Sequence, residues 1–387
     1  MRQKYINSDF KLGILGGGQL GKMMALAVGN WHLPIYFLDQ SKDFPAGPYG
    51  MGFTEGNFKD YDDVYAFGKD KDVLSIEIEH VNTDALLALE AEGVVIHPAP
   101  KQLNIIKDKG LQKQFYADHQ LPTAPFKLYE DKASLLNAIR QGDRSYPFVQ
   151  KSRTAGYDGK GVAVINEESD LGKLLEGPCM VEDKVAINKE LAVIVARNPS
   201  GEIKSYPTVE MEFNPIANLV EFLISPAQIT ATQEAEAQKI AKETIEAYGL
   251  CGLLAVELFL DIEGNILINE VAPRPHNSGH HTIDSSYTSQ FEQHIRAVLD
   301  LPLGSTKEKA PVGIMVNLLG EAGHTGPADY QGLKELLSME GVYPHIYGKE
   351  LTKPFRKMGH ATILGEHIEE TKARAKAAQA ALKIVSS

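Results

Sequence analysis

The chain has 387 residues, enough for two or three domains of ordinary size. Its 51 acidic and 39 basic residues give a net charge of −12, and no basic run offsets it, so the sequence argues against nucleic-acid binding. No apolar run approaches the roughly 18 residues of a membrane span, and residues 1–10 lack the apolar segment of a signal peptide. The two cysteines fit neither a disulfide framework nor a CxxC metal motif. We therefore expect a reduced cytoplasmic protein that does not bind membranes.

Residues 1–105 alternate apolar strands with helices. Strands are expected at 12–15, 33–39, 73–78 and 94–97. This alternation is typical of a parallel sheet covered by helices on both faces. The sequence therefore predicts a Rossmann-like N-terminal domain, followed by a single helix at 104–119.

The pattern changes after Pro122. Short strands bracket a helix at 132–141 and a glycine-rich loop, which predicts a small α+β lid domain over residues 122–186. The remaining residues, 187–387, form the predicted C-terminal domain. They include a long helix at 230–248, capped by Gly249, and an alanine- and lysine-rich helix at 369–384.

The first strand runs into a glycine loop in which Gly16, Gly18 and Gly21 match the dinucleotide fingerprint, and Asp39 ends the second strand. The loop also approaches a phosphate-loop pattern, but Met23 stands where that motif needs a Ser or Thr hydroxyl for Mg²⁺. The loop by itself leaves three interpretations open: a nicotinamide cofactor, another ligand at the helix N-terminus, or close packing.

A second glycine loop joins two strands between Lys151 and Val162. Its glycines allow backbone N–H groups to face a phosphate, and Lys151 and Lys160 add positive charge. The alternative interpretation is an ordinary polar hairpin tip. We favour a flap that closes over a triphosphate.

The predicted hairpin at 252–271 permits a geometric argument. A two-residue turn at 263–264 would place Glu257 directly opposite Glu270. Carboxylates about 5 Å apart repel each other unless a cation lies between them, and their neighbours are apolar. We therefore predict a Mg²⁺ or Mn²⁺ site at Glu257 and Glu270, the alternative being an error in register that exposes one of them.

Two further polar segments follow. Arg274, His276 and Asn277 come directly after the predicted metal strand and suggest an oxyanion pocket, whereas a zinc site at the nearby histidines lacks partners at zinc spacing. The segment 349–360 holds the densest positive charge in the chain. It is interpreted as an anion site, with a solvated loop as the alternative.

Taken together, these motifs resemble the ATP-grasp superfamily and, within it, the N5-carboxyaminoimidazole ribonucleotide synthases. The resemblance rests on five segments in the same order along the chain. They are Gly-Gly-Gly-Gln-Leu-Gly at 16–21, Glu-Ile-Glu-His-Val at 77–81, Gly-Tyr-Asp-Gly-Lys-Gly at 156–161, Asn-Glu-Val-Ala-Pro-Arg-Pro-His-Asn-Ser-Gly-His at 269–280 and Arg-Lys-Met-Gly-His at 356–360.

The resemblance implies an ATP-grasp fold and a homodimeric ligase of purine biosynthesis. Bicarbonate attacks ATP to give carboxyphosphate, and 5-aminoimidazole ribonucleotide then captures the CO₂ released. The implied catalytic residues are Asp158, Arg274, His276, Asn277 and Lys349, and the implied metal ligands are Glu257 and Glu270. The implied nucleotide contacts are Lys109, Lys151, Gly156, Tyr157, Asp158, Gly159, Lys160, Gly161, Val162, Glu182, Asp183, Lys184, Val185, Glu190, Phe213, Asn269 and Glu270. The implied ribonucleotide contacts are Gln19, Glu79, Tyr157, Asp158, Lys160, Lys349 and Arg356.

Two positions depart from the family pattern. Phe213 stands where many relatives carry a histidine, and Lys109 stands where an arginine is frequent. Other ATP-grasp enzymes, such as a formate-using glycinamide ribonucleotide transformylase or a biotin carboxylase, are the nearest rival hypotheses. A nicotinamide-dependent dehydrogenase leaves Glu257, Glu270 and the second glycine loop unexplained, and a noncatalytic nucleotide-binding scaffold does not require so many ionisable residues.

Overall fold

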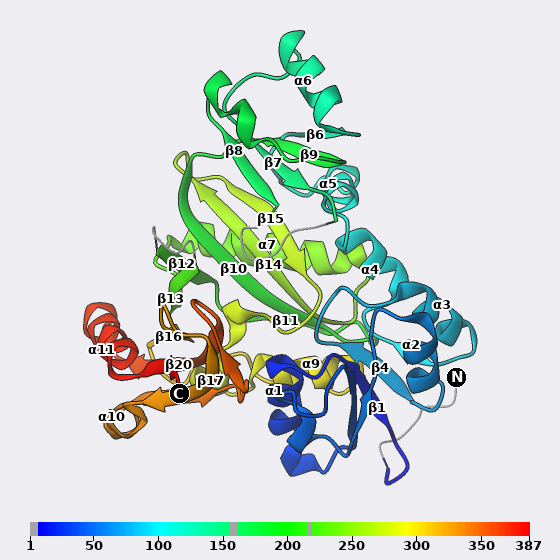
Figure 1. Cartoon of the computed structure of the whole chain (residues 1–387), viewed down its shortest axis with the longest axis vertical. Helices are drawn as coiled ribbons and strands as arrows, with labels where there is room; N and C mark the ends of the chain where they lie inside the picture. Colours follow the sequence, from blue (N-terminus) through cyan, green and yellow to red (C-terminus); the bar gives the residue numbers. More distant parts are fainter. Residues whose placement is uncertain (1–6, 155–160, 215–218) are drawn as a thin grey trace.

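The computed structural model describes residues 7–154, 161–214 and 219–387 of the chain. It begins with a parallel five-stranded sheet in the order β3-β2-β1-β4-β5; the alternating pattern predicts the parallel arrangement and four of these strands, but not the edge strand β3. Helices cover both faces of this sheet (Figure 1). Its elements are β1 (Leu12–Leu15), α1 (Gln19–Ala27), β2 (Ile35–Asp39), β3 (Gly52–Glu55), α2 (Tyr61–Gly68), β4 (Val73–Ile76), α3 (Thr83–Ala91) and β5 (Val95–Ile96).

Two helices replace the single helix predicted at 104–119. They are α4 (Pro100–Ile106) and α5 (Lys109–Asp118). The helix is interrupted between them because Asp108 caps the N-terminus of α5. The Asp108 carboxylate accepts hydrogen bonds from the amides of Gly110 and Leu111, at 2.8 and 3.1 Å. A side chain that satisfies free N–H groups in this way favours a new helix start over a continuous helix.

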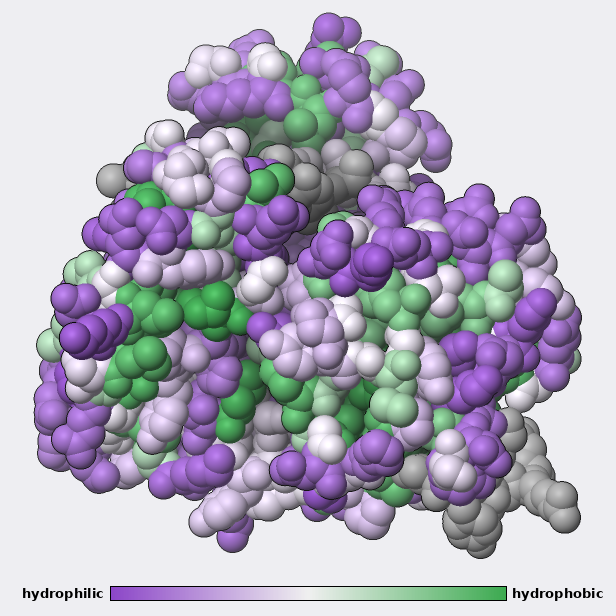
Figure 2. All heavy atoms as spheres, turned by 60° about the horizontal axis from the view of Figure 1, so that its bottom comes forward, coloured by the Kyte–Doolittle hydropathy of each residue, from purple (hydrophilic) through white to green (hydrophobic). Residues whose placement is uncertain are grey.

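The lid is a four-stranded antiparallel sheet in the order β6-β9-β7-β8 with one covering helix. It projects from one end of the molecule, at the top of Figure 1. In Figure 2, polar residues cover most of its surface, whereas apolar residues on the forward face of the molecule form separate patches. Its elements are β6 (Phe126–Tyr129), α6 (Lys132–Arg140), β7 (Phe148–Ser152), β8 (Val162–Ile165) and β9 (Cys179–Asp183).

The largest sheet is antiparallel and follows the order β15-β14-β10-β12-β13-β16-β20-β18, with β11 beside β10. One of its faces packs against α7, whose αL cap at Gly249 agrees with the sequence prediction. The elements are β10 (Ile187–Arg197), β11 (Ile203–Ser205), β12 (Val209–Asn214), β13 (Leu219–Ser225), α7 (Ala231–Tyr248), β14 (Gly252–Asp261), β15 (Ile266–Ala272), α8 (Thr282–Ser285), α9 (Gln290–Val298), β16 (Val312–Leu319), β18 (Val342–Ile346) and β20 (Lys357–Gly365).

The C-terminal prediction needs a correction. The last helix, α11 (Ile368–Ala381), ends three residues earlier than predicted, and β21 (Lys383–Ser386) follows it. The apolar residues Ile384 and Val385 lie in this strand, which pairs with β17 (Gly326–Gln331), so sheet pairing outweighs helical propensity there. The small sheet has the order β19-β17-β21, with β19 (Leu351–Thr352) at its edge and α10 (Leu333–Ser338) after β17.

Helix α9 joins the N-terminal domain to the large sheet. Phe291 and Ile295 belong to the same buried cluster as the apolar face of α1, whereas Ala297 packs with β10 and β14. Buried His294 lies 2.9 Å from the Ser75 hydroxyl on β4 and accepts a hydrogen bond from the amide of Leu253 on β14. The end of β4 is therefore held close to the strand that carries Glu257.

Candidate active site

Glu257 on β14 and Glu270 on β15 are paired in strand register, as predicted, but the turn between the strands is not the predicted one. The Asp261 N–H donates to the Asn265 carbonyl, which closes a three-residue loop with Gly264 at φ 92°. That loop alone would pair Glu257 with Asn269. A β-bulge between Glu257 and Leu258 shifts the register by one residue and restores the pair.

The bulge has a direct effect on the site. Neighbouring residues of a regular strand point to opposite faces, but Asn269 and Glu270 both line the same narrow cleft between the lid and the large sheet. Bulges re-aim side chains in this way, and they are frequent next to active sites. The cleft is lined by Lys109, Gln112, Lys113, Lys151, Met180, Asn269 and Glu270.

Each carboxylate of the pair has a basic partner. The Lys109 ammonium forms an ion pair with Glu270, and Nε2 of His276 lies 3.3 Å from a Glu257 oxygen. Burial and the neighbouring Glu270 and Glu190 carboxylates raise the pKa of Glu257 well above its usual range. Burial also opposes ionisation of Glu270, but Lys109 and Lys151 together outweigh it, so the pKa of Glu270 is lowered.

These two carboxylates fit a hard divalent cation. Within residues 7–154, 161–214 and 219–387, no group of three or more His, Cys, Asp or Glu side chains could hold a metal ion. Zinc needs such a group, whereas Mg²⁺ is commonly bound by one or two carboxylates together with phosphate oxygens and water. The donor set therefore suits Mg²⁺ or Mn²⁺ bound with a nucleotide.

The lid contributes a buried ionic network to the same cleft. Lys151 on β7 lies 2.6 Å from Oε1 of Glu182 on β9 and donates to the Asn269 side chain at 2.8 Å. Asp183 and Lys184 differ, because their side chains pair with Arg144 and Asn166 inside the lid. Any nucleotide contact of these two residues would therefore be made by the backbone.

The other predicted nucleotide contacts among the described residues lie at β8, on β10 and β12, or between β9 and β10. Glu190 on β10 is partly buried, and burial raises its pKa against the influence of Lys151. Phe213 on β12 is 38% exposed, and Val185 lies between β9 and β10. Gly161, at φ 78°, and Val162 return the chain to β8. The predicted contacts Gly156, Tyr157, Asp158, Gly159 and Lys160 lie outside the described residues.

The first glycine loop binds two carboxylates of its own domain. The Gly17 amide donates to Asp39 at 2.7 Å, and the amides of Gly18 and Gly21 donate to Glu77 at 2.6 and 2.5 Å. A dinucleotide pyrophosphate would have to displace both acids, so the structure argues against a nicotinamide cofactor. Glu77 was not among the predicted site residues, although it opens the 77–81 segment at the end of β4.

The predicted oxyanion pocket meets the N-terminal domain. Arg274 forms an ion pair of 2.8 Å with Glu79, and its Nε is buried without a hydrogen-bond partner. Nδ1 of His276 accepts from the Ser278 amide at 3.3 Å, which leaves Nε2 as the protonated nitrogen facing Glu257. Burial and the nearby Arg274 and Lys357 lower the pKa of His276 to about 3, so its imidazole is neutral at pH 7.

The remaining predicted residues lie on three other segments of the chain. Asn277 begins a short 3₁₀ turn, Asn277–Gly279, and Gln19 opens α1. Lys349 donates to the Lys357 carbonyl at 2.7 Å, and Arg356 donates to the Leu351 carbonyl at 2.5 Å. Lys22 on α1 reaches the Ile346 carbonyl at 2.8 Å, so the basic segment lies beside the first glycine loop's helix.

Comparisons with known proteins place these features in a family. Three family models match: the ribonucleotide synthetase preATP-grasp domain at residues 10–107, the ATP-grasp domain at 114–291 and the phosphoribosylaminoimidazole carboxylase C-terminal domain at 313–374. The N5-carboxyaminoimidazole ribonucleotide synthase of Bacillus subtilis is 36% identical over 374 residues, 96% of this chain and 95% of that protein. The chain belongs to the N5-carboxyaminoimidazole ribonucleotide synthase family.

Solved structures of this family agree with the fold. The synthetase from Thermotoga maritima has a TM-score of 0.89 and 42% identity, covering 98% of this chain and 100% of that one. The Aspergillus clavatus synthase in complex with ADP and 5-aminoimidazole ribonucleotide has a TM-score of 0.86 and 31% identity, covering 96% and 97%. The predicted ATP-grasp fold with a Rossmann-like N-terminal domain is confirmed.

Some relatives of the family are longer than this chain. The chloroplastic phosphoribosylaminoimidazole carboxylase of Vigna aconitifolia is 38% identical over 92% of this chain, which spans only 64% of that protein. Among the described helices, none has the length and apolar character needed to cross a membrane.

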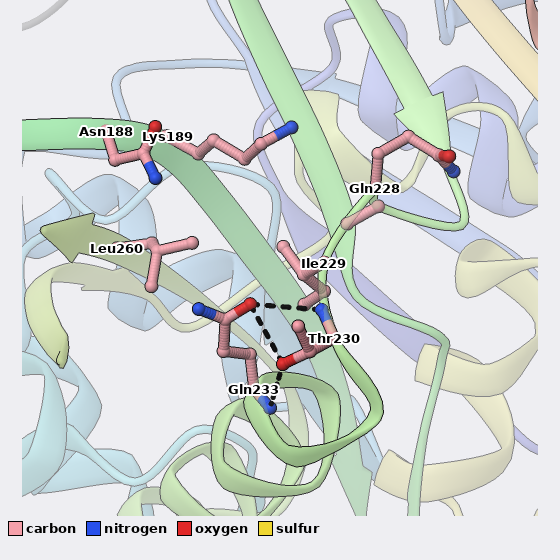
Figure 3. A pocket seen from close by; sticks show the side chains of 8 residues that line it. Asn188, Lys189, Gln228, Ile229, Thr230, Gln233 and Leu260 are labelled. Atoms are coloured by element: carbon pink, nitrogen blue, oxygen red, sulfur yellow. Dashed lines mark hydrogen bonds between the residues drawn. The ribbon is translucent and has the colours of Figure 1, made fainter. Parts of the chain in front are cut away.

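A separate pocket of about 370 Å³ lies near the N-terminus of α7 (Figure 3). Its Thr230 and Gln233 side chains bond to each other, and Lys189 pairs with Glu210. Leu260 in this pocket belongs to the core on the α7 face of the sheet. This pocket shares no lining residue with the cleft between the lid and the large sheet, so the two are distinct.

Proposed function

We propose that this chain uses ATP and bicarbonate to carboxylate 5-aminoimidazole ribonucleotide to N5-carboxyaminoimidazole ribonucleotide, releasing ADP and phosphate. The observation that carries the proposal is the convergence of three units at one cleft. The lid supplies Lys151, the large sheet supplies Glu257 and Glu270, and the N-terminal domain supplies Glu79 through its ion pair with Arg274.

ATP would lie between the lid and the large sheet. Lys109 and Lys151 supply positive charge for its phosphates, and Glu257 and Glu270 would hold Mg²⁺ or Mn²⁺. Bound there, the cation would neutralise charge on the phosphate oxygens. Because phosphoryl transfer depends chiefly on positioning and charge neutralisation, these groups meet its main requirements.

The bicarbonate oxygen would attack the γ-phosphorus as ADP leaves, giving carboxyphosphate. Arg274 offers a fixed guanidinium beside this position, together with a buried Nε that lacks a partner in the described structure. A neutral His276 can donate a hydrogen bond from Nε2 to this intermediate. Asn277 and Lys349 would complete the anion pocket.

Carboxyphosphate would then break down to CO₂ and phosphate, and the 5-amino group of the ribonucleotide would attack the CO₂. The departing phosphate can accept the amine proton. Glu79 pairs with Arg274 at the pocket, and we assign Gln19, Glu79, Lys349 and Arg356 to the ribonucleotide by resemblance. Tyr157, Asp158 and Lys160 of the flap are assigned to it by resemblance. We further propose a cytoplasmic homodimer.

The experiment that tests this function is a coupled assay of ADP release with each substrate omitted in turn. We expect release to require both bicarbonate and 5-aminoimidazole ribonucleotide for its full rate. Glycinamide ribonucleotide with formate, and biotin with bicarbonate, serve as the competing substrates. ADP release that either competing pair stimulates as strongly would assign the chain to another ATP-grasp activity.

A further inference from the structure

Lys113 is a buried lysine in the cleft that none of the assignments above uses. It lies on α5, and its side chain is 3% exposed. Its ammonium lies 2.9 Å from Oε2 of Glu182 and donates to the Thr123 hydroxyl and the Ile268 carbonyl. Burying an ammonium is costly unless it is paired, so a lysine at this position points to a specific electrostatic role.

Glu182 is shared between two lysines. Oε1 faces Lys151 at 2.6 Å, Oε2 faces Lys113 at 2.9 Å, and the carboxylate is 4% exposed. The carboxylate therefore has little surface to offer a ligand directly. Two ammonium groups and one carboxylate leave the group with one positive charge.

That positive charge lies at the nucleotide side of the network. Lys151 also bonds to Asn269, next to the Glu270 carboxylate in the cleft. Without Lys113, Glu182 would fully neutralise Lys151, and the pair would attract phosphate much more weakly. With Lys113 present, Glu182 does not fully cancel the positive charge of the Lys151 ammonium.

We propose that Lys113 is a positioning residue that acts through Glu182. It keeps the Lys151 ammonium oriented toward the nucleotide and prevents Glu182 from cancelling the positive charge of Lys151. The inference rests on the proposed use of ATP. It does not depend on bicarbonate or the ribonucleotide, because nucleotide binding precedes their chemistry and is measured separately. A purely structural role for Lys113 would instead affect unfolding and leave nucleotide affinity unchanged.

The test is calorimetric binding of ATP with Mg²⁺, without bicarbonate or ribonucleotide, to the full chain. Lys113→Met should raise the ATP Kd roughly tenfold or more, the scale expected for weakening one charged contact. In a Glu182→Gln background the same change should raise Kd by less than about threefold, because no carboxylate remains to neutralise Lys151. Lys132→Met, which removes a lid lysine paired with Glu176, is the matched control and should leave Kd unchanged.

An equal effect of Lys113→Met in both backgrounds, or no effect on ATP affinity despite a lower Tm, would overturn the proposal. If Lys113→Met does not fold, Lys113→Gln replaces it, because the amide can still donate to Thr123 and Ile268. The ATP Kd of Lys113→Gln is then measured in the parent and Glu182→Gln backgrounds, with the same expected results. If the parent chain binds ATP but does not carboxylate the ribonucleotide, the proposed function fails while this inference stands.

Discussion

At the scale of single residues, the cleft pairs its acids with cations or imidazole before a ligand binds. Glu270 pairs with Lys109, and Glu182 pairs with Lys113 and Lys151, whereas the partner of Glu257 among the described residues is the neutral His276. Glu257 is therefore the carboxylate that gains most from an added cation. Its raised pKa has the same cause, since burial and neighbouring carboxylates disfavour its charge.

Glu257→Gln and Glu270→Gln should separate metal binding from folding. Both should abolish Mg²⁺-dependent ATP turnover, because each removes one of the two facing carboxylates. Glu257→Gln should keep its unfolding free energy within about 1 kcal/mol of the parent, since no strong ion pair is lost. Urea unfolding and Mg²⁺ titration of ATP turnover measure the two effects. Normal turnover of either variant at limiting Mg²⁺ would refute the metal site.

Arg356→Ala tests the ribonucleotide side of the pocket. Loss of a charged phosphate contact should raise the KM for 5-aminoimidazole ribonucleotide about 10- to 150-fold, equivalent to ~1.5–3 kcal/mol, with kcat less affected. Lys349→Ala should lower kcat more than it changes KM. Steady-state kinetics with each substrate varied measures both. A normal ribonucleotide KM with a raised ATP KM would place Arg356 on the nucleotide side.

At the scale of elements, helix α5 and the bulged strand β15 determine which residues reach the cleft. α5 carries both Lys109 and Lys113, and its N-cap Asp108 also pairs with Arg153 of the lid at 2.7 Å. The bulge in the β14–β15 hairpin turns Asn269 and Glu270 to the same side. The helix start and the bulge therefore bring two lysines and two polar acceptors together.

Asp108→Ala should weaken both the helix start and its contact with the lid. We expect a loss of about 1 kcal/mol from the cap alone, with a further loss from the Arg153 pair. ATP KM should rise as well, because Lys109 and Lys113 follow this cap. Asp108→Asn, which keeps an acceptor for the Gly110 amide, is the control and should lose less stability. Equal urea midpoints for parent and Asp108→Ala would contradict this account.

Local patterns predict these elements better than distant contacts do. The Glu257–Glu270 pair could be expected because both residues lie in one hairpin, although the loop and the bulge could not. Glu77 and Lys113 could not be assigned because their partners are far away in sequence and only the tertiary fold brings them together. The strand at Ile384 was missed for the same reason, since its partner β17 decides its conformation.

At the scale of the whole molecule, α9 and the buried histidines around it join the N-terminal domain to the large sheet. His294 bridges β4 and β14, and burial lowers its pKa to about 3. Burial also lowers the pKa of His97 and of His281 to about 4. These imidazoles remain neutral in the folded protein at pH values where the unfolded chain protonates them.

Folding stability should therefore fall as the pH drops below 6.5. Six histidines of the described chain have pKa values lowered by burial and take up protons on unfolding, namely His97, His276, His280, His281, His294 and His360, whereas Glu77 and Glu257, whose pKa values burial raises to about 7 and about 8, release protons. The histidine contribution is complete above pH 6.5 and is lost toward pH 4. Because more of these groups take up protons on unfolding than release them, the free energy of unfolding should fall between pH 6 and 5.

Urea unfolding at pH 7, 6 and 5 measures the slope of the free energy of unfolding against pH. His294→Gln should reduce the slope by the contribution of about one proton, because the imidazole that takes up this proton on unfolding is no longer present. A stability that does not change over this pH range would contradict the neutral, buried state of these histidines.

In the proposed reaction, ATP activates bicarbonate as carboxyphosphate in the cleft between the lid and the large sheet. The most direct measurement uses ¹⁸O-labelled bicarbonate with ATP and 5-aminoimidazole ribonucleotide, followed by mass analysis of the phosphate released. We expect one ¹⁸O atom to pass from bicarbonate to each phosphate formed. Phosphate that carries no label, while ADP is produced at the full ribonucleotide-dependent rate, would contradict the proposed reaction.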